Sequence, residues 1–206
     1  MINTKDENKK EKNELNLETI TLGGGCFWCT EAIFEEINGV KKIEVGYAGG
    51  QTPEPNYEEV CKGNTDHAEV TQITFNTKII SLKEILRIFF LTHDPTTLNQ
   101  QGYDIGTQYR SIILHDNNQK GIIEDVIKEI ELEKMWDNKI VTEISPLRIF
   151  HKAEEQHQRF YSKNPNYGYC QIIITPKITE FRKKYLSKLK KNNVKSKRTT
   201  SFILKN

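Results

Sequence analysis

The stretch from Gly23 to Cys29, with the sequence GGGCFWC, constrains this chain more than any other. A β-prone run over 18–22 precedes the glycines, and a pattern typical of a helix follows as far as Ile37. We therefore predict a strand, a tight turn and a helix whose first turn begins at Cys26. The free N–H groups and partial positive charge of a helix N-terminus stabilise a thiolate, which is the nucleophilic form of cysteine. A nucleophilic Cys26 is the resulting hypothesis, and a buried structural cysteine is the alternative.

Composition narrows the class of protein. The 206 residues suit one domain with tails, and the net charge of +2 gives no general attraction to nucleic acid or membrane. Four scattered cysteines are typical of reduced thiols in a reducing compartment rather than of a disulfide scaffold. The first residues mix Lys and Glu without an apolar core, so no secretory signal is predicted. We expect a cytoplasmic protein with no nucleic-acid or membrane partner.

Three segments are predicted along the chain. Residues 1–16 form a polar leader that we expect to be disordered, residues 17–190 form the folded domain, and residues 191–206 form a basic tail. From Arg182 onward there are ten Lys or Arg and no Asp or Glu. Such a run is either an arm for an anionic partner or a solvated helix end and tail, and we favour the second.

Strands and helices are expected to alternate along the folded domain, which predicts a mixed α/β or α+β class. Ser81 followed by Glu84 predicts a capping box at the start of a helix. The expected strands lie near 18–22, 40–47, 69–75, 109–115, 140–145 and 170–175, and the expected helices near 27–38, 82–92, 118–134, 152–162 and 176–190.

The GGGCFWC stretch resembles the signature of the peptide methionine sulfoxide reductase A family, and the resemblance extends from about Leu17 to Leu189. Further motifs occur in the order and at the spacing of that family, namely Tyr47-Ala-Gly-Gly50, Tyr57-Glu-Glu-Val-Cys61, His67-Ala-Glu69, His93-Asp-Pro95, Gly106-Thr-Gln-Tyr-Arg-Ser111, Ala153-Glu-Glu-Gln-His157 and Asn164-Pro-Asn-Tyr-Gly-Tyr-Cys170.

The resemblance implies an α+β fold: a two-layer α/β sandwich with a ferredoxin-like core and a mixed sheet, followed by an extended C-terminal segment. It also implies thiol-dependent reduction of methionine S-sulfoxide, free or in proteins, as protein repair under oxidative stress. The family is mostly monomeric, and we expect a monomer here.

The resemblance also assigns chemical roles. Cys26 attacks the sulfoxide sulfur, and Phe27 and Trp28 form the pocket for the methyl group. The oxygen is a poor leaving group unless it is protonated, which requires a carboxyl group kept neutral near pH 7 by burial. The glutamate at the corresponding position, Glu69, is the expected acid.

Other substrate contacts are implied in the same way. Tyr57 and Tyr109 match tyrosines that donate hydrogen bonds to the sulfoxide oxygen. Asp104 matches an aspartate that binds the substrate backbone or its amine side. His67 precedes Glu69 by two residues, so on a strand both would face the same side, and we expect His67 to help place Glu69.

Attack converts Cys26 into a sulfenic acid, and a second thiol must condense with it. Cys170 lies in a motif that resembles the resolving-cysteine motif of one family branch, whereas Cys29 forms a Cys-x-x-Cys pair with Cys26. We favour Cys170 and keep Cys29 as the alternative. Cys61 is expected to be structural. The family implies thioredoxin as electron donor, with dithiothreitol as a substitute in vitro and with no cofactor.

Several other functions compete with this hypothesis. A thioredoxin-like disulfide oxidoreductase would use Cys26 and Cys29, and a Cys–His hydrolase would use Cys26 with His67 or His157. A binding module would keep the fold without the chemistry. A metal site is not expected, because the spacing of His151, Glu154, Glu155 and His157 misses the known zinc patterns. Glu154 and Glu155 are expected to be solvated or capping charges.

Overall fold

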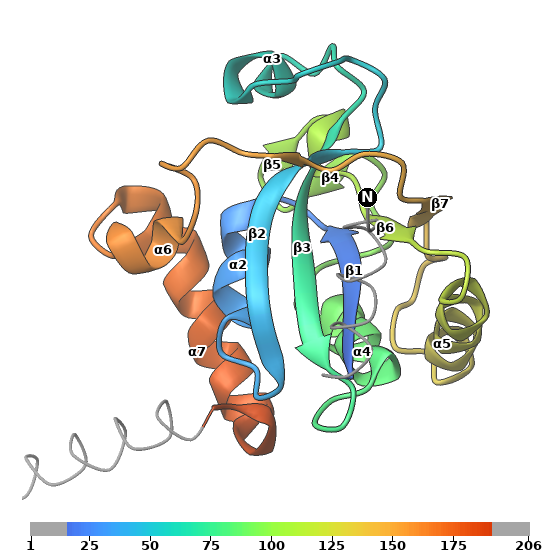
Figure 1. Cartoon of the computed structure of the whole chain (residues 1–206). Coiled ribbons are helices and arrows are strands. Elements are labelled where there is room, and N and C mark those ends of the chain that lie inside the picture. The colour runs from blue at the N-terminus through green and yellow to red at the C-terminus, as the bar shows by residue number, and fades with distance from the viewer. Residues whose placement is uncertain (1–15, 191–206) are drawn as a thin grey trace, which may run out of the picture.

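The computed structural model describes residues 16–190 (Figure 1). The predicted polar leader, apart from Asn16, and the predicted basic tail lie outside the described residues. Within the described part of the chain, no helix has the length and apolar character needed to cross a membrane.

A mixed six-stranded sheet, with the order β7-β6-β1-β3-β2-β8, forms one layer of the domain. All neighbouring strands pair antiparallel except β6 and β7, which pair parallel. The strands are β1 (Leu17–Gly23), β2 (Val40–Ala48), β3 (Ala68–Asn76), β6 (Ile112–His115), β7 (Glu143–Pro146) and β8 (His151–Lys152).

The central four strands and two helices have ferredoxin-like connectivity. Helix α2 (Phe27–Phe34) joins β1 to β2, and α4 (Leu82–Thr92) lies between β3 and β6. The resulting βαββαβ order, with the sheet order β6-β1-β3-β2, confirms the predicted ferredoxin-like core. Strands β7 and β8 extend this core at its two edges, and the parallel β6–β7 pair makes the sheet mixed.

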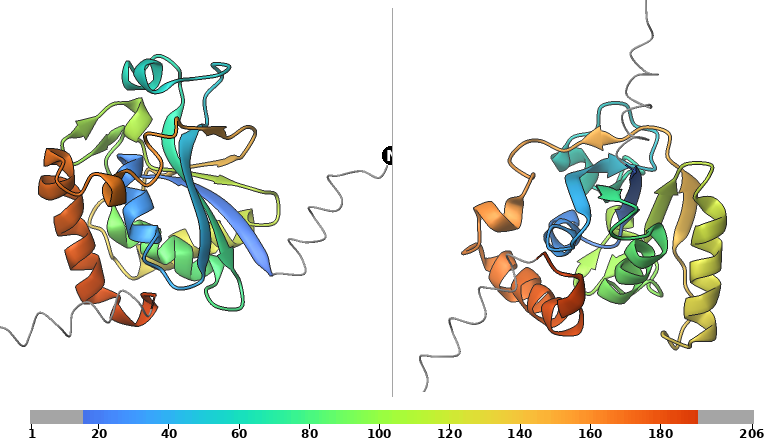
Figure 2. Two further views of the ribbon diagram at one scale, coloured as in Figure 1. Left: turned by 60° about the vertical axis from the view of Figure 1, so that its left-hand side comes forward. Right: turned by 60° about the horizontal axis from the view of Figure 1, so that its bottom comes forward.

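The helices form the second layer. Helices α2, α4, α5 (Lys120–Leu132) and α7 (Thr175–Lys184) lie on one side of the sheet (Figure 2, right). Their apolar faces and that side of the sheet share one buried cluster, which includes Phe34, Phe75 and Phe89. Among residues 16–190, the opposite side of the sheet carries a small cluster, on which Leu147 and Phe150 of the segment between β7 and β8 pack. The domain is therefore a two-layer α/β sandwich, as predicted.

Two helices, α4 and α3 (Tyr57–Cys61), begin with recognisable caps. The predicted capping box at Ser81 is present, because its hydroxyl accepts the N–H of Glu84 and the Glu84 carboxylate accepts the N–H of Ser81. Helix α3 starts after Asn56, whose side chain accepts the N–H of Glu59. These side chains satisfy N–H groups that the first helical turn leaves unpaired.

Two sequence-based elements are wrong. Residues 170–175 are not a strand, because Cys170–Ile174 is a π-helical turn that leads directly into α7. The β-branched run favours a strand, but the turn packs against α2, and the Thr175 hydroxyl donates to the Cys170 carbonyl at 2.9 Å. In place of a helix over 152–162, the chain forms β8, a series of turns, and the short helix α6 (Phe160–Lys163).

The remaining elements are short and lie in two places. The strands β4 (Gln100–Gln101) and β5 (Asp104–Ile105) form a hairpin, followed by the 3-10 turn Thr107–Tyr109. A second 3-10 turn, Leu186–Lys188, follows α7 and returns the chain to the end of α2, where the Asn38 N–H donates to the Lys188 carbonyl at 2.8 Å.

Candidate active site

The glycine turn brings β1 into α2 as predicted. A Cβ on Gly23 would lie 2.8 Å from the carbonyl oxygen of Glu69, which leaves no room for a side chain. Gly25 has φ +87°, and a Cβ there would lie 2.6 Å from the Gln101 side chain. Both positions therefore favour glycine. The turn places Cys26 at the N-cap of α2, where it is 7% exposed.

Burial dominates the protonation of Cys26. Burial raises the pKa of this thiol well above its ordinary value, and the interactions with Cys29 and Glu69 raise it further. The Cys26 side chain is therefore a protonated thiol at neutral pH rather than the thiolate that the helix start favours. The Cys29 thiol has the opposite shift, because its hydrogen bond with Cys26 lowers its pKa. The two sulfurs form an interacting pair one helical turn apart.

Glu69 is a buried carboxyl group on β3, only 1% exposed. Its Oε2 atom accepts the N–H of Phe27, the first residue of α2, at 3.0 Å. Burial raises its pKa to about 8, although the Phe27 hydrogen bond opposes this shift. A carboxyl group with this pKa is mostly protonated at neutral pH, as a proton donor requires.

Aromatic rings surround the start of α2. The ring of Phe27 lies 6.4 Å from that of Tyr57, and the ring of Trp28 lies 3.8 Å from that of Phe160 with an interplanar angle of 9°. The His157 ring lies 4.2 Å from that of Tyr57 with an interplanar angle of 30°, and it stacks on Trp28 at 5.7 Å. The predicted apolar wall at Phe27 and Trp28 is thus part of a larger aromatic cluster.

The two tyrosines expected at the site lie near Glu69 and Cys26. Tyr57 is the first residue of α3, and Tyr109 ends the 3-10 turn after the β4–β5 hairpin. Burial raises the pKa of each phenol, and the charges of Glu69 and Cys26 raise both further. Both side chains therefore keep their O–H groups and are able to donate hydrogen bonds.

Asp104 is connected to the cysteines through Tyr169. The Tyr169 hydroxyl donates to Oδ2 of Asp104 at 2.8 Å and lies 3.9 Å from the sulfur of Cys29. Tyr169 also packs edge-on against Trp28. Tyr169 is not among the residues predicted for the site, although its position directly before Cys170 was a usable signal.

Cys170 is fully buried as the first residue of the π-helical turn. Burial raises the pKa of its thiol, and Cys29 raises it further. Cys26, Cys29 and Cys170 belong to the same buried cluster, and all three are free thiols. The structure therefore brings both predicted resolving cysteines to the same side of the sheet as Cys26.

A family model for peptide methionine sulfoxide reductase matches residues 18–190. The chain belongs to this family. Peptide methionine sulfoxide reductase MsrA of Saccharolobus solfataricus is 52% identical over 175 residues, which cover 84% of this chain and 98% of the relative. The MsrA of Trichodesmium erythraeum is 50% identical over 168 residues, covering 81% and 95%.

Solved structures of the same family share the fold. Mxr1 from Saccharomyces cerevisiae in reduced form superposes with a TM-score of 0.68 at 40% identity, over 75% of this chain and 90% of that chain. Methionine sulfoxide reductase A of Corynebacterium diphtheriae superposes with a TM-score of 0.67 at 35% identity, over 76% and 79%.

The hydrogen-bond partners of the His67 ring lie in a loop outside β3. Its Nδ1 accepts the N–H of Gly50 at 3.1 Å, and its Nε2 lies 2.8 Å from the Thr52 carbonyl. The ring therefore fixes the loop that leads from β2 to α3 and makes no hydrogen bond to Glu69. His67 lies one residue before β3, and its expected help in placing Glu69 stays a prediction. With both nitrogens bound to this loop, His67 is also not free to act as a base for Cys26.

The charges near His157 have structural partners. Glu154 accepts the Tyr57 N–H at 2.9 Å and the Tyr47 hydroxyl at 2.8 Å, which confirms the expected capping role. Glu155 forms surface ion pairs with Lys152 and Lys163. Across residues 16–190, no group of three or more His, Cys, Asp or Glu is placed to hold a metal ion.

Glu31 is a buried residue that the sequence analysis overlooked. It lies on α2 and is 1% exposed, and burial raises its pKa to about 7. Its carboxylate accepts the backbone N–H groups of Arg159 and Phe160 at 2.7 and 3.2 Å. A glutamate three residues after Trp28 lies on the same side of the helix, and this spacing was the available signal.

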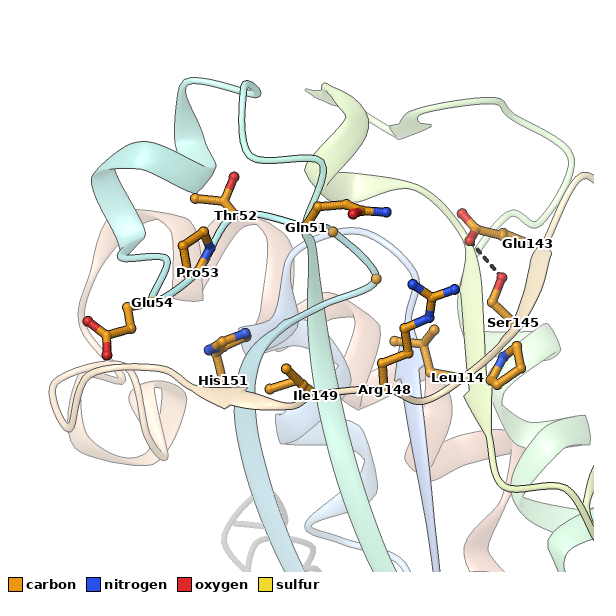
Figure 3. Close-up of a pocket in the computed structure, with 13 residues that line it drawn as sticks. Gln51, Thr52, Pro53, Glu54, Leu114, Glu143, Ser145, Arg148, Ile149 and His151 are labelled. Carbon is orange, nitrogen blue, oxygen red and sulfur yellow. Dashed lines mark hydrogen bonds between the residues drawn. The ribbon is translucent and has the colours of Figure 1, made fainter.

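A cavity of about 490 Å³ lies away from the cysteines, between the loop 49–54 and the segment 143–151 (Figure 3). Leu114 in its wall belongs to the small cluster on the sheet face opposite the helices. The lining contains Arg148 and His151 but none of the residues expected at the active site. The cavity is therefore separate from the site around Cys26.

Proposed function

We propose that this chain reduces methionine S-sulfoxide, free or in polypeptides, to methionine, with residues 17–190 as the catalytic unit. The observation that carries the proposal is the pairing of a buried thiol, Cys26, with a buried carboxyl group, Glu69, at the start of one helix. Aromatic side chains at Phe27 and Trp28 supply a surface for the methyl group. Family membership supports the same reaction.

In the first step, the Cys26 sulfur attacks the sulfoxide sulfur. A sulfur–sulfur bond forms while Glu69 protonates the oxygen, and Glu69 takes up the proton that the Cys26 thiol gives off. The S–O bond to the substrate and the sulfur–sulfur bond then break as the oxygen passes to the Cys26 sulfur, so the products are methionine and the Cys26 sulfenic acid. Glu69 suits the role of acid because its pKa of about 8 keeps it protonated at neutral pH.

Three polar side chains are proposed to bind the substrate. The hydroxyls of Tyr57 and Tyr109 donate to the sulfoxide oxygen. The Asp104 carboxylate, oriented by Tyr169, binds the substrate backbone or amine side. Neutral phenols suit the oxygen because they donate hydrogen bonds without adding charge to an apolar site.

In the second step, a thiol condenses with the sulfenic acid to give a disulfide and water. Cys170 is the favoured thiol and Cys29 the alternative. Thioredoxin then reduces the disulfide, so the cycle needs no resident cofactor. A monomer in a reducing compartment such as the cytoplasm suits this chemistry, and the proposed role is repair of oxidised methionine.

Reductant-dependent turnover of separated S and R epimers of methionine sulfoxide tests the proposal. We expect turnover of the S epimer alone, and its loss in Cys26→Ser. Reduction of neither epimer by folded, reduced protein contradicts the proposal.

The resolving cysteine follows from the same assay with two reductants. Replacement of the resolving residue by serine abolishes turnover with thioredoxin but not with dithiothreitol, which reduces the sulfenic acid directly. We expect Cys170→Ser to behave in this way and Cys29→Ser to keep thioredoxin-dependent turnover. The reverse result assigns resolution to Cys29.

A further inference from the structure

A buried carboxylate ties α2 to the segment 157–160. Both backbone N–H groups that Glu31 accepts, those of Arg159 and Phe160, belong to this segment. The Glu31 carboxylate is 1% exposed, and burying it away from water costs free energy. The two N–H groups offset this cost only while the segment stays in place. Arg159 has φ +56°, a conformation that disfavours side chains, so the segment depends on such contacts.

Phe160, which follows Arg159, stacks on Trp28. The Phe160 ring lies parallel to the indole at 3.8 Å. The indole N–H is buried and has no hydrogen-bond partner within residues 16–190. The orientation of Trp28 therefore depends on packing, and Phe160 provides its closest ring contact.

The other end of the same segment is held by Gln158. Its side chain accepts the N–H of Val45 and donates to the carbonyls of Val45 and Ala153. His157, directly before it, packs against the Tyr57 ring. The segment 157–160 is thus fixed to β2 by Gln158 and to α2 by Glu31, and its two rings support the aromatic wall.

We infer that Glu31 is a positioning residue that holds Phe160 on Trp28 and so sets the size of the alkyl group that the sulfoxide site accepts. The inference rests on the proposed function, in which Trp28 contacts the substrate methyl group. Glu31 acts only through the backbone of residues 159 and 160. With this support the site favours a methyl sulfoxide over one with a larger alkyl group.

The variant Glu31→Gln is nearly isosteric, but it replaces one carboxylate oxygen with an NH₂ group. That group is a donor, so it is unable to accept a backbone N–H, and one of the two hydrogen bonds is lost. Glu31→Asp keeps the charge and shortens the side chain by one methylene. It provides the same test if the glutamine variant does not fold.

The first measurement compares kcat/KM for methionine S-sulfoxide and ethionine S-sulfoxide. One methylene in an apolar pocket is worth a discrimination of about tenfold or more. We expect Glu31→Gln to lower the methyl-to-ethyl ratio by about fivefold, and Phe160→Leu to lower it similarly. In the Phe160→Leu background, Glu31→Gln should produce no further change. An unchanged ratio in Glu31→Gln, or full additivity of the two changes, overturns the inference.

Glu36→Gln is the matched control. Glu36 is also a buried glutamate, 7% exposed, and pairs with Arg182 of α7 away from the aromatic wall. Its replacement should lower thermal stability and leave the methyl-to-ethyl ratio unchanged. A ratio that falls equally in Glu36→Gln shows a general loss of stability and contradicts a specific role for Glu31.

A fluorescence measurement separates this inference from the proposed function. Trp28 and Trp136 are the two tryptophans of the chain, so Trp136→Phe leaves Trp28 as the reporter. In that background we expect Glu31→Gln to increase acrylamide quenching of Trp28 about twofold, and Glu36→Gln to leave it unchanged. Unchanged quenching in Glu31→Gln contradicts the inference even if the protein reduces sulfoxides. Increased quenching together with a wild type that reduces no sulfoxide shows that Glu31 positions Trp28 and contradicts the proposed function alone.

Discussion

At the scale of the residue, the site combines two groups that burial keeps protonated. Cys26 and Glu69 both have raised pKa values, so each holds its proton until a substrate enters. A sulfoxide changes this balance, because its oxygen accepts protons and its sulfur is electrophilic. The buried pair is therefore suited to deliver a nucleophile and protons together.

The proposed role of Glu69 as the acid predicts a pH dependence. We expect kcat of the wild type to fall as pH rises through about 8, since Glu69 then loses the proton that we propose it donates. Glu69→Gln should lower kcat by about 10²-fold or more and remove this alkaline limb. Single-turnover rates from pH 6 to 10 measure both effects. An alkaline limb that persists in the variant shows that another group provides the proton.

At the scale of the element, the glycine turn positions Cys26, the proposed nucleophile. Gly25→Ala places a Cβ at φ +87° against Gln101, so we expect a loss of about 1–3 kcal/mol in the free energy of unfolding. Denaturant unfolding measures this loss, and no change would show that the turn tolerates a side chain. Gly121→Ala is a suitable comparison, because a Cβ there meets nothing within 4 Å.

The capping box at Ser81 is expected to contribute to stability and not to turnover. Ser81→Ala removes the hydroxyl that accepts the Glu84 N–H and should lower the free energy of unfolding by about 1 kcal/mol. Turnover should stay unchanged, because Ser81 lies at the start of α4, whereas the cysteine turn meets the other end of this helix, where a Cβ on Gly24 would contact Phe89 and His93. Equilibrium unfolding combined with the epimer assay separates the two quantities, and a selective loss of turnover would contradict this local role.

The sequence predicted those elements whose signals are local. The strand–turn–helix around Cys26 and the helix that starts after Ser81 follow from glycines, periodicity and a capping box. The strand predicted over 170–175 is wrong, because its β-branched residues favour a strand while packing against α2 makes the segment helical. The partners of His67 and Glu31 were also not predictable, since both bind backbone groups from distant segments.

At the scale of the whole molecule, the fold buries ionisable side chains. Burial raises the pKa of Glu69 to about 8 and that of Glu31 to about 7. Above the ordinary value near 4.5, the folded state then binds more protons than the unfolded state. The free energy of unfolding therefore falls as pH rises above about 4.5, at about 1.4 kcal/mol per unit for each group, up to about pH 7 for Glu31 and about pH 8 for Glu69.

Glu69→Gln tests this linkage. Glutamine carries no charge, so the variant should lose less stability than the wild type as the pH rises. We expect the free energy of unfolding of the variant, relative to wild type, to increase by a few kcal/mol between pH 5 and 9. Urea unfolding at both pH values measures the difference. Parallel pH profiles for the two proteins would contradict the raised pKa of Glu69.

The central claim is that Cys26 receives the sulfoxide oxygen, and a single turnover without reductant tests it most directly. The protein with Cys29→Ser and Cys170→Ser is mixed with methionine S-sulfoxide and a sulfenic acid trap, and intact mass and peptide mapping follow. We predict one equivalent of methionine per chain and the trap on Cys26. Methionine release without modification of Cys26, or modification of another residue in its place, would contradict the account.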